Sequence, residues 1–280
     1  AETAACYAAQ LRAGGIRPGE VVAIHGPRSF GLIAAMLAVM QAGGVMLLLD
    51  KNLPPARCQA MLAEAQPRQL LFITTPTAPR PAICEEARWQ QVTHIDAWRV
   101  EQAEIGEPTV DPQAACYLFF TSGTTGTPKG IIGQQQALAH FLQWQRDTFA
   151  IGPGDRCAQL TGLSFDVVLR DILTPLIGGA TLCLPPEEED LSAATLFPWF
   201  YERGITAFHT VPTIVKSWLL AAEQVIRLPS LRRIFFAGEL LPVNLVRQWR
   251  QQVSEQAEIV NLYGPTETTL AKSFYRVPTA

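Results

Sequence analysis

The sequence predicts an α/β fold built on parallel β-sheet, and three observations carry this prediction. Of the 280 residues, 48% are hydrophobic and only 17% are charged, which is typical of a chain with a large buried core. Strand-like and helix-like segments alternate along most of the chain. Polar, glycine-containing stretches follow several of the apolar runs. Because parallel strands need helical crossovers, this order places helices on the faces of the sheet.

In the first half of the chain, short strand-like segments alternate with helix-like segments. One segment, residues 31–49, is nearly all apolar and about as long as a membrane span. Gln41 and the pair Gly43-Gly44 divide it into a helical part and a strand, so no membrane span is expected. Residues 75–112 are rich in Pro, Thr and Glu and predict irregular edge structure before a central strand that begins at Ala115. The elements expected before them are strands at 21–25, 45–49 and 69–73 and helices at 29–42 and 55–64.

Strand-like and helix-like segments also alternate in the second half of the chain. We expect two lobes, residues 1–158 and residues 159–280. An acidic quartet, residues 187–190, is interpreted as a solvated turn. The helices expected here span 134–148, 167–176, 191–202, 213–222 and 245–252. The strands expected here span 156–160, 180–184, 206–210, 233–237 and 258–262.

Composition excludes several classes of function. A net charge of -3 gives no reason to expect nucleic-acid binding. The six cysteines are scattered without a C-x-x-C pair, and the four histidines are equally dispersed. We therefore expect reduced thiols in a cytoplasmic protein without structural zinc. No signal peptide is visible at the start of the sequence.

The most informative segment is residues 117–130, in which an apolar strand runs into a loop of hydroxyls, glycines and one lysine. Glycines let the backbone approach a ligand, hydroxyls donate hydrogen bonds, and the lysine supplies a mobile cation. These are the parts of a phosphate cradle. The spacing does not fit G-x-x-x-x-G-K-[ST], so a Walker-type NTPase is not expected. The candidate residues are Thr121, Ser122, Gly123, Thr124, Thr125, Gly126, Thr127 and Lys129.

Three further polar clusters follow predicted strands, at 164–166, 237–239 and 261–269. Ligands bind at the carboxyl ends of the strands in open parallel sheets, so these clusters are candidates for one site. Each has a structural alternative. Asp166 could be a helix N-cap, Gly238-Glu239 could be a turn, and His209 could be a core histidine.

Two of these segments resemble the signature motifs of the adenylate-forming superfamily. They are Phe120 to Gly130 and Asn261 to Thr268, which lie about 130 residues apart in the family's order. The resemblance extends to residues 41–50, 163–166 and 177–182, and so covers nearly the whole chain. It implies the large N-terminal lobe of these enzymes, an α/β arrangement of stacked, parallel-rich β-sheets flanked by helices. From the resemblance we expect that the lobe is incomplete in this sequence and that the small C-terminal lobe is absent from it.

Within this superfamily the chain most resembles an adenylation domain of a nonribosomal peptide synthetase. The resemblance implies ATP- and Mg²⁺-dependent conversion of an amino acid carboxylate into an aminoacyl-AMP, followed by transfer to a phosphopantetheine-bearing carrier domain. Two alternatives stay open, namely an acyl- or aryl-CoA ligase of the same superfamily and an inactive fragment that retains the fold. The family's ribose-binding aspartate, hinge and lysine-bearing C-terminal lobe have no counterpart in this sequence. We therefore expect weak or no activity from the chain by itself, and an active parent protein.

The resemblance assigns a role to each motif residue. The loop Thr121 to Lys129 is implied to hold the β- and γ-phosphates, and Glu267 to ligate Mg²⁺. Thr121, Lys129 and Glu267 are the implied catalytic residues. The implied adenine and α-phosphate contacts are Gly238, Glu239, Asn261, Tyr263, Gly264 and Thr266.

The substrate pocket follows from the same resemblance. Asp166 is implied to bind the α-ammonium group of an amino acid. Arg170 would favour an acidic or hydrogen-bond-accepting side chain, unless Asp171 neutralises it or it turns to solvent. The amino acid itself stays open. The remaining pocket residues are Val167, His209, Phe235, Ala237, Leu262, Leu270 and Ala271.

Overall fold

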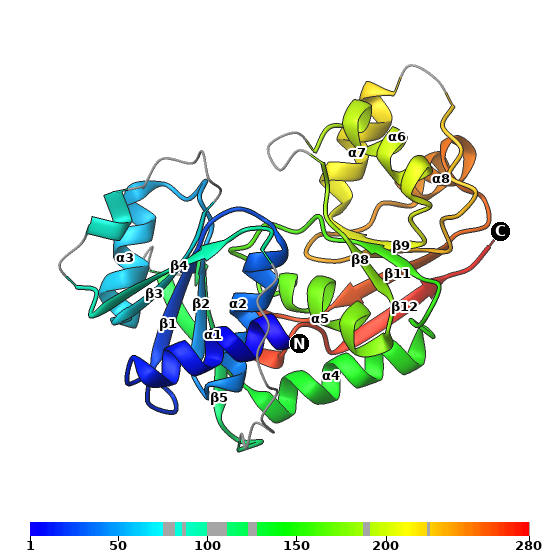
Figure 1. The fold of residues 1–280 in the computed structure, drawn as a ribbon. Helices are drawn as coiled ribbons and strands as arrows, with labels where there is room; N and C mark the ends of the chain where they lie inside the picture. The colour runs from blue at the N-terminus through cyan, green and yellow to red at the C-terminus, as the bar shows by residue number, and fades with distance from the viewer. Residues whose placement is uncertain are drawn as a thin grey trace. The chain divides into compact units, whose positions relative to one another are not determined.

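The computed structural model describes residues 1–74, 82–85, 88–99, 111–122, 128–186, 191–222 and 225–279. Contacts divide the chain into two compact units. The first comprises Ala1–Ala139 with Leu163–Phe165, and the second comprises His140–Gly162 with Asp166–Ala280. Each unit contains one six-stranded sheet (Figure 1). The boundary expected at residue 158 lies inside the second unit.

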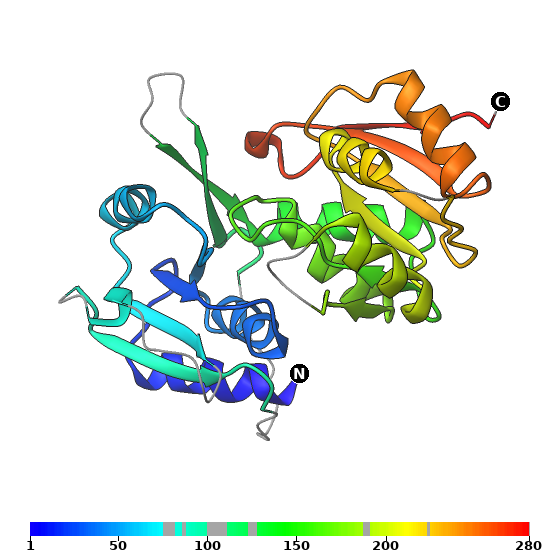
Figure 2. The same cartoon turned by 90° about the horizontal axis from the view of Figure 1, so that it is seen from above.

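The first sheet has the order β4-β3-β1-β2-β5-β6. Its first five strands are parallel, and β6 runs antiparallel to β5 at the edge (Figure 2). Helices α1 and α2 pack together on one face, and α3 lies on the other (Figure 1). The helices are α1 (Glu2–Ala13), α2 (Phe30–Gln41) and α3 (Pro55–Ala65). The strands are β1 (Val21–His25), β2 (Val45–Leu49), β3 (Gln69–Thr74), β4 (Gln91–Asp96), β5 (Ala115–Ser122) and β6 (Pro128–Gln134).

The apolar segment 31–49 folds as a helix, a glycine turn and a strand, as predicted. The Ser29 hydroxyl accepts a hydrogen bond from the Leu32 amide and caps α2. Gly43 has φ +77° in the following turn, a conformation that glycine adopts without strain. Strand β2 is buried at every position, as expected where both faces of a parallel sheet are covered. No helix among the described residues is long and apolar enough to cross a membrane.

The sequence did not predict two strands of the first sheet, β4 and β6. β4 lies where irregular structure was expected, and it pairs in parallel with β3. Its side chains are mostly half-exposed, because an edge strand needs no continuous apolar run. β6 begins at Pro128 and contains Lys129 and Gly130, which belong to the segment 117–130 that was expected to end in a phosphate-binding loop. A proline at the first position of an edge strand removes no inner ladder bond, so the strand tolerates it.

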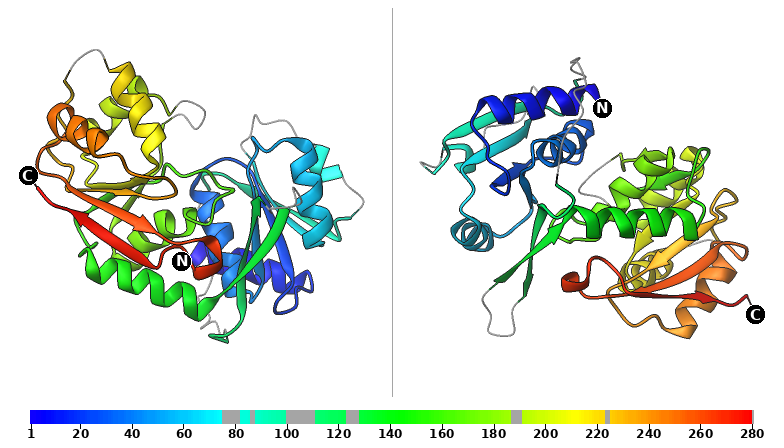
Figure 3. Two further views of the ribbon diagram at one scale, coloured as in Figure 1. Left: turned by 180° about the vertical axis from the view of Figure 1, so that it is seen from behind. Right: turned by 90° about the horizontal axis from the view of Figure 1, so that it is seen from below.

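The second sheet has the order β12-β11-β10-β9-β7-β8, parallel except for the edge strand β12. Helices α6, α7 and α8 cover one face, and α4 and α5 cover the other (Figures 1 and 3). The helices are α4 (Gln135–Thr148), α5 (Val168–Gly178), α6 (Ala193–Arg203), α7 (Pro212–Ala221) and α8 (Val243–Gln252). The strands are β7 (Arg156–Ala158), β8 (Thr181–Cys183), β9 (Ala207–Thr210), β10 (Arg233–Phe236), β11 (Glu258–Tyr263) and β12 (Ser273–Val277). Strand β12 was not predicted, because its side chains are exposed or half-exposed and carry little apolar signal.

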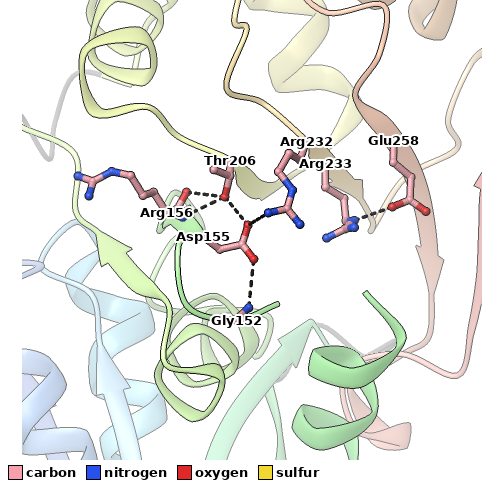
Figure 4. A network of polar contacts seen from close by, with 7 residues as sticks. All are labelled: Gly152, Asp155, Arg156, Thr206, Arg232, Arg233 and Glu258. Carbon is pink, nitrogen blue, oxygen red and sulfur yellow. Dashed lines mark hydrogen bonds and ion pairs between the residues drawn. The ribbon is translucent and has the colours of Figure 1, made fainter. Parts of the chain in front are cut away.

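A polar network fixes the amino ends of the second sheet's parallel strands (Figure 4). Asp155, which is only 3% exposed, accepts hydrogen bonds from the Thr206 hydroxyl at 2.8 Å and the Gly152 amide at 3.1 Å. Arg232 lies 3.1 Å from the same carboxylate. Glu258 of β11 pairs with Arg233 of β10 at 2.6 Å. The network lies at the amino ends of these strands, opposite the carboxyl ends at which ligands bind in parallel sheets.

The prediction of an α/β fold with parallel-rich sheets flanked by helices is confirmed. Each unit has its own core between sheet and helices. In the second unit an aromatic cluster that includes Phe197, Phe200, Phe208, Trp218 and Trp249 fills the α6–α8 face. The acidic quartet 187–190 lies outside the described residues.

Candidate functional site

In the first unit, the predicted phosphate loop begins and ends inside a β-hairpin. Thr121 of β5 stands opposite Lys129 of β6 in the antiparallel register. Lys129 is exposed and therefore available to a ligand, while Thr121 is half-buried. Gly123, Thr124, Thr125, Gly126 and Thr127 lie outside the described residues, as does the side chain of Ser122.

In the second unit, the carboxyl ends of β9, β10 and β11 bring predicted site residues to one edge. Thr210, Phe236 and Asn261 are level with one another in the parallel register. His209 precedes Thr210, and Ala237 follows Phe236. The expected convergence of the polar clusters at 237–239 and 261–269 therefore follows from strand pairing.

The segment after β11 is a tight turn whose backbone geometry requires Gly264. A Cβ at Gly264 would lie 2.5 Å from the Ala271 Cα, a distance that no side chain can occupy. Thr269 and Leu270 both have positive φ, 64° and 67°. Left-handed backbone is strained for a buried, bulky residue such as Leu270, which is 3% exposed. Such strain is typical of segments that are held in place for a function.

This turn presents its polar groups to solvent. The Tyr263 ring is 74% exposed, and the Glu267 carboxylate is also exposed. An exposed aromatic face can stack on a flat base, and an exposed carboxylate can ligate Mg²⁺. No cluster of three or more metal-ligating side chains occurs in the described part of the chain. One carboxylate suits Mg²⁺ that is shared with substrate phosphates.

Asp166 precedes α5 and is held by the same turn. Its carboxylate accepts hydrogen bonds from the Thr266 side chain and from the backbone amide of Val167. Burial raises the pKa of this carboxyl above its ordinary value, although these hydrogen bonds and the charge of Arg170 oppose the shift. A carboxylate in such a partly desolvated position is poised to pair with a cationic ligand.

His209 lies in a buried hydrogen-bonded chain that joins α4, α5 and β9. Its Nε2 is 2.7 Å from Gln145 Nε2, and its Nδ1 is 3.0 Å from Asp171 Oδ1. Gln145 Oε1 accepts a hydrogen bond from the Thr174 hydroxyl at 3.1 Å. Burial lowers the pKa of His209, while Asp171 opposes the shift. A neutral His209 ring fits this series of hydrogen bonds, because Nδ1–H then faces Asp171 and Nε2 accepts from the Gln145 amide.

Arg170 lies near this chain and is 1% exposed. Its Nε and Nη1 atoms have no hydrogen-bond partner among the residues that the structure describes. Burial lowers the pKa of the guanidinium, while the charges of Asp171 and then Asp166 raise it. The alternative in which Arg170 turns to solvent is wrong, because the side chain is fully buried.

The apolar members of the predicted pocket also come together. The ring of His209 stacks on Phe235 with centroids 4.4 Å apart. Phe235 and Leu262 belong to one buried cluster, and Ala237 and Ala271 pack against it. Val167 is half-buried and starts the helix that carries Arg170. The second unit thus gathers the sequence-predicted pocket residues at one edge of its sheet and along the start of α5.

Glu239 has a structural partner in this structure. Its carboxylate accepts hydrogen bonds from the Thr213 amide at 3.0 Å and the Thr213 hydroxyl at 2.6 Å. It thereby caps the first turn of α7. Gly238 has φ +82°, so the turn before Glu239 favours glycine for its conformation.

Sequence reasoning missed two polar residues of this hydrogen-bonded chain, Gln145 and Thr174, and considered Asp171 only as a partner for the charge of Arg170. A signal existed for Gln145, because it falls on the apolar stripe of α4 formed by Leu138, Phe141 and Leu142. A glutamine at such a position needs an internal partner. No local pattern identifies that partner, because His209 lies 64 residues further along the chain.

The fold is that of an α/β protein with two parallel-rich sheets, and comparison with known families identifies its family. The chain belongs to the family of AMP-binding enzymes, whose model matches residues 1–279. The predicted membership of the adenylate-forming superfamily is thus confirmed.

Among curated proteins, the chain is 34% identical over 270 residues to enterobactin synthase component F of Escherichia coli O157:H7. It is 30% identical over 295 residues to the large subunit of L-2-aminoadipate reductase of Eremothecium gossypii. The alignments cover 95% and 96% of this chain but 20% and 21% of those proteins. The chain therefore spans about a fifth of the length of these relatives.

Among solved structures, the chain resembles the nonribosomal peptide synthetase FmoA3. In the AMPPNP-bound form the TM-score is 0.84 at 25% identity, covering 98% of this chain and 29% of the other. In the form bound to α-methyl-L-serine-AMP the TM-score is 0.85 at 25% identity, covering 99% and 31%. These similarities agree with the predicted resemblance to adenylation domains of peptide synthetases.

Proposed function

We propose that the protein containing this chain activates an amino acid as its aminoacyl-AMP. The observation that carries this proposal is Asp166, a partly desolvated carboxylate beside the pocket of the second unit. A desolvated carboxylate is a costly feature to leave unpaired, and the α-ammonium group of an amino acid would satisfy it. Its relatives support the proposal, since L-2-aminoadipate reductase and the α-methyl-L-serine-AMP complex of FmoA3 both have an amino acid in their names.

In the proposed reaction, the amino acid carboxylate attacks the α-phosphorus of ATP and pyrophosphate leaves. The chain contributes positioning and charge neutralisation, and no covalent intermediate with the protein is needed. Lys129 and the hydroxyls of loop 121–127 would bind the β- and γ-phosphates. Glu267 would hold Mg²⁺, which would neutralise phosphate charge as the bond to pyrophosphate breaks.

The adenosine contacts belong to the second unit. Tyr263 would stack on the base, with Gly238 and Asn261 beside it. Thr266 would serve two partners, since its side chain already bonds Asp166 and its turn would approach the α-phosphate. Glu239 would support the site through its bonds to Thr213 and would contact the base with its backbone. Transfer of the acyl group to a phosphopantetheine thiol on a carrier domain completes the proposed function.

The competing hypothesis within the family is an acyl- or aryl-CoA ligase. Such an enzyme has no ammonium group to bind, and the charge of Asp166 would repel its carboxylate substrate. The hypothesis of an inactive fragment is disfavoured because Lys129, Tyr263 and Glu267 are all present and exposed, where each is available to a ligand.

Pyrophosphate exchange on the full-length protein tests the proposal. We expect exchange to depend on an added amino acid and to fall by at least about 100-fold in Asp166→Ala, because a charge-assisted hydrogen bond in a desolvated site is lost. Lys129→Ala and Glu267→Ala should reduce exchange with every amino acid, since they act on ATP. Lys216→Ala, an exposed lysine on α7, is the matched control and should have no effect. Exchange that depends on a carboxylic acid without an amino group would contradict the proposal.

A further inference from the structure

Three arginines lie at the amino ends of the second sheet, and the proposed function uses none of them. Arg156 is the first residue of β7, Arg203 is the last residue of α6, and Arg227 lies in the segment between α7 and β10. The side chains of Arg203 and Arg227 are exposed, and that of Arg156 is half-exposed. We call these three residues the arginine edge.

Two carboxylates at these strand ends are already paired with other arginines. Asp155 lies 3.1 Å from Arg232, and Glu258 lies 2.6 Å from Arg233. In the described part of the chain, no residue of the arginine edge forms an ion pair. The fold therefore leaves a local excess of positive charge at this edge.

Two residues of the arginine edge are held close together. Arg156 Nε donates a hydrogen bond to the backbone carbonyl of Arg203, which is a neutral acceptor. Burial raises the pKa of the Cys183 thiol, and the charges of Arg156 and Arg203 both oppose that shift, so both act on the same point. Figure 4 shows the Arg156 guanidinium turned away from Asp155. Like charges at short range repel each other, and an anionic partner would relieve this repulsion.

An open groove of about 570 Å³ lies beside the arginine edge. It runs between α6 and the segment that follows α7, and the two helices pack side by side (Figure 1). Arg227 belongs to its lining, so the groove is continuous with the arginine edge. Exposed apolar surface of this kind marks an interaction site. Its apolar lining includes Ala194, Phe197, Pro198, Tyr201, Ala222 and Ile226.

We propose that this surface binds an acidic segment of a partner polypeptide. The carboxylates of the segment would pair with the arginine edge, and its apolar side chains would enter the groove. Charge complementarity supports this partner, because Glu202 is the one carboxylate in the lining of the groove, beside three arginines without an ion pair among the described residues. Arginine also suits carboxylates in geometry, since its planar fork donates two parallel hydrogen bonds to them.

Nucleic acid and anionic membranes fit this surface less well. The net charge of -3 gives the chain no general attraction to polyanions. A phosphate backbone has no apolar groups that could fill a groove lined by alanine and isoleucine. Membrane-binding surfaces insert apolar side chains into the bilayer, whereas the apolar residues here form a recess.

Selection from a library of displayed peptides tests the proposal without a known partner. The full-length protein is immobilised and random peptides of about 12 residues, long enough to span a groove, are selected on it. We expect the selected peptides to combine Asp or Glu with Leu, Ile or Phe. Synthetic copies should bind more weakly as NaCl is raised, because salt screens exposed charges.

Two variants separate the charge from the groove. Arg203→Glu combined with Arg227→Glu should raise the Kd of the synthetic peptides by at least about tenfold, because attraction becomes repulsion. Ala194→Trp fills the groove without changing charge and should also weaken binding. Arg247→Glu and Gln248→Trp, at exposed positions of α8, are the matched controls and should leave the Kd unchanged. Thermal unfolding checks that every variant keeps the fold.

The inference is overturned if no peptide is selected, or if the selected peptides are neutral or basic. It is also overturned if their Kd is the same in the charge-reversed variant. Single-stranded DNA and phosphatidylserine vesicles are tested in parallel. Binding of either one that depends on Arg203 and Arg227, without binding of acidic peptides, would identify a different class of partner and refute the proposal.

Discussion

At the scale of single residues, the pocket depends on polar side chains that are buried and paired in unexpected ways. Asp171 and Arg170 are neighbours on α5, yet Asp171 bonds with His209 and Thr161 rather than with Arg170. The reason is geometric, because consecutive helical residues point in directions about 100° apart. Asp171 still compensates the charge of Arg170, since it raises the pKa of the guanidinium against the effect of burial.

The buried, neutral His209 predicts how stability depends on pH. Its folded-state pKa is lowered below the ordinary value of 6.5, so the unfolded chain binds its proton first as the pH falls. Stability should be fully present above pH 6.5 and should decline below it, by at most about 1.4 kcal/mol per pH unit from this residue. Thermal unfolding between pH 5 and pH 8 measures this slope.

The contribution of His209 can be isolated by substitution. His209→Gln should flatten the decline below pH 6.5, whereas His140→Gln, on an exposed residue of α4, should not. Asp166 has the opposite effect on stability, because its pKa is raised in the folded state. Its contribution to the free energy of unfolding is present at low pH and is lost as the pH rises through that pKa. Identical slopes in the wild type and His209→Gln would contradict the neutral assignment.

At the scale of elements, the turn between β11 and β12 is fixed by close backbone packing. The Lys272 amide donates to the Tyr263 carbonyl at 2.8 Å, and the Ala271 amide donates to the Thr269 carbonyl at 2.8 Å. These bonds bring residue 271 against Gly264 and hold Leu270 at positive φ. The turn carries Thr266 and Glu267, so its backbone sets the positions of two proposed ligand contacts.

Gly264→Ala should therefore disrupt the site more than the fold. The added Cβ would lie 2.5 Å from Ala271 Cα and 2.7 Å from Lys272 N, so the turn must shift. We expect a loss of about 1–3 kcal/mol in the free energy of unfolding, together with a large fall in pyrophosphate exchange. Gly152→Ala is the matched control, because its Cβ would meet its nearest neighbour at 3.8 Å. Equal effects of the two substitutions would refute this account of the turn.

At the scale of the whole molecule, stabilising contacts and the proposed site of amino acid activation lie at opposite ends of the parallel strands of the second unit. The network of Asp155, Thr206 and Arg232 joins the start of the parallel strands (Figure 4). The proposed site lies at the opposite, carboxyl ends. Substitutions at the two edges should therefore separate stability from activity.

Asp155→Asn tests this separation. The buried carboxylate would lose its pairing with Arg232 and part of its hydrogen bonding, which should reduce the free energy of unfolding by about 1–3 kcal/mol. Below the unfolding transition, the KM for the amino acid should stay unchanged. Denaturant unfolding and pyrophosphate exchange measure the two effects. Asp147→Asn removes an exposed ion pair with Arg146 and should have no measurable effect. A raised KM in Asp155→Asn would show that the two edges are coupled.

The sequence by itself determined the element order, the parallel sheets and the family, because periodicity and contiguous motifs are local properties of the chain. It also identified segments that follow strands: Tyr263 is the last residue of β11, Glu267 lies in the turn after it, and Asp166 lies between β7 and α5. It did not reveal edge strands β4, β6 and β12, whose half-exposed residues lack an apolar pattern.

Only the tertiary structure decided which polar groups pair in the pocket. A series of side-chain contacts runs from Thr174 through Gln145 and His209 to Asp171, and it joins residues of α4, α5 and β9. Burial removes water as an alternative partner, so each group must take whichever neighbour the packing brings within reach. The packing places Asp171 Oδ1 3.0 Å from His209 Nδ1 and leaves Arg170 Nε and Nη1 without a hydrogen-bond partner in the described part of the chain, a result that no local pattern in the sequence contains.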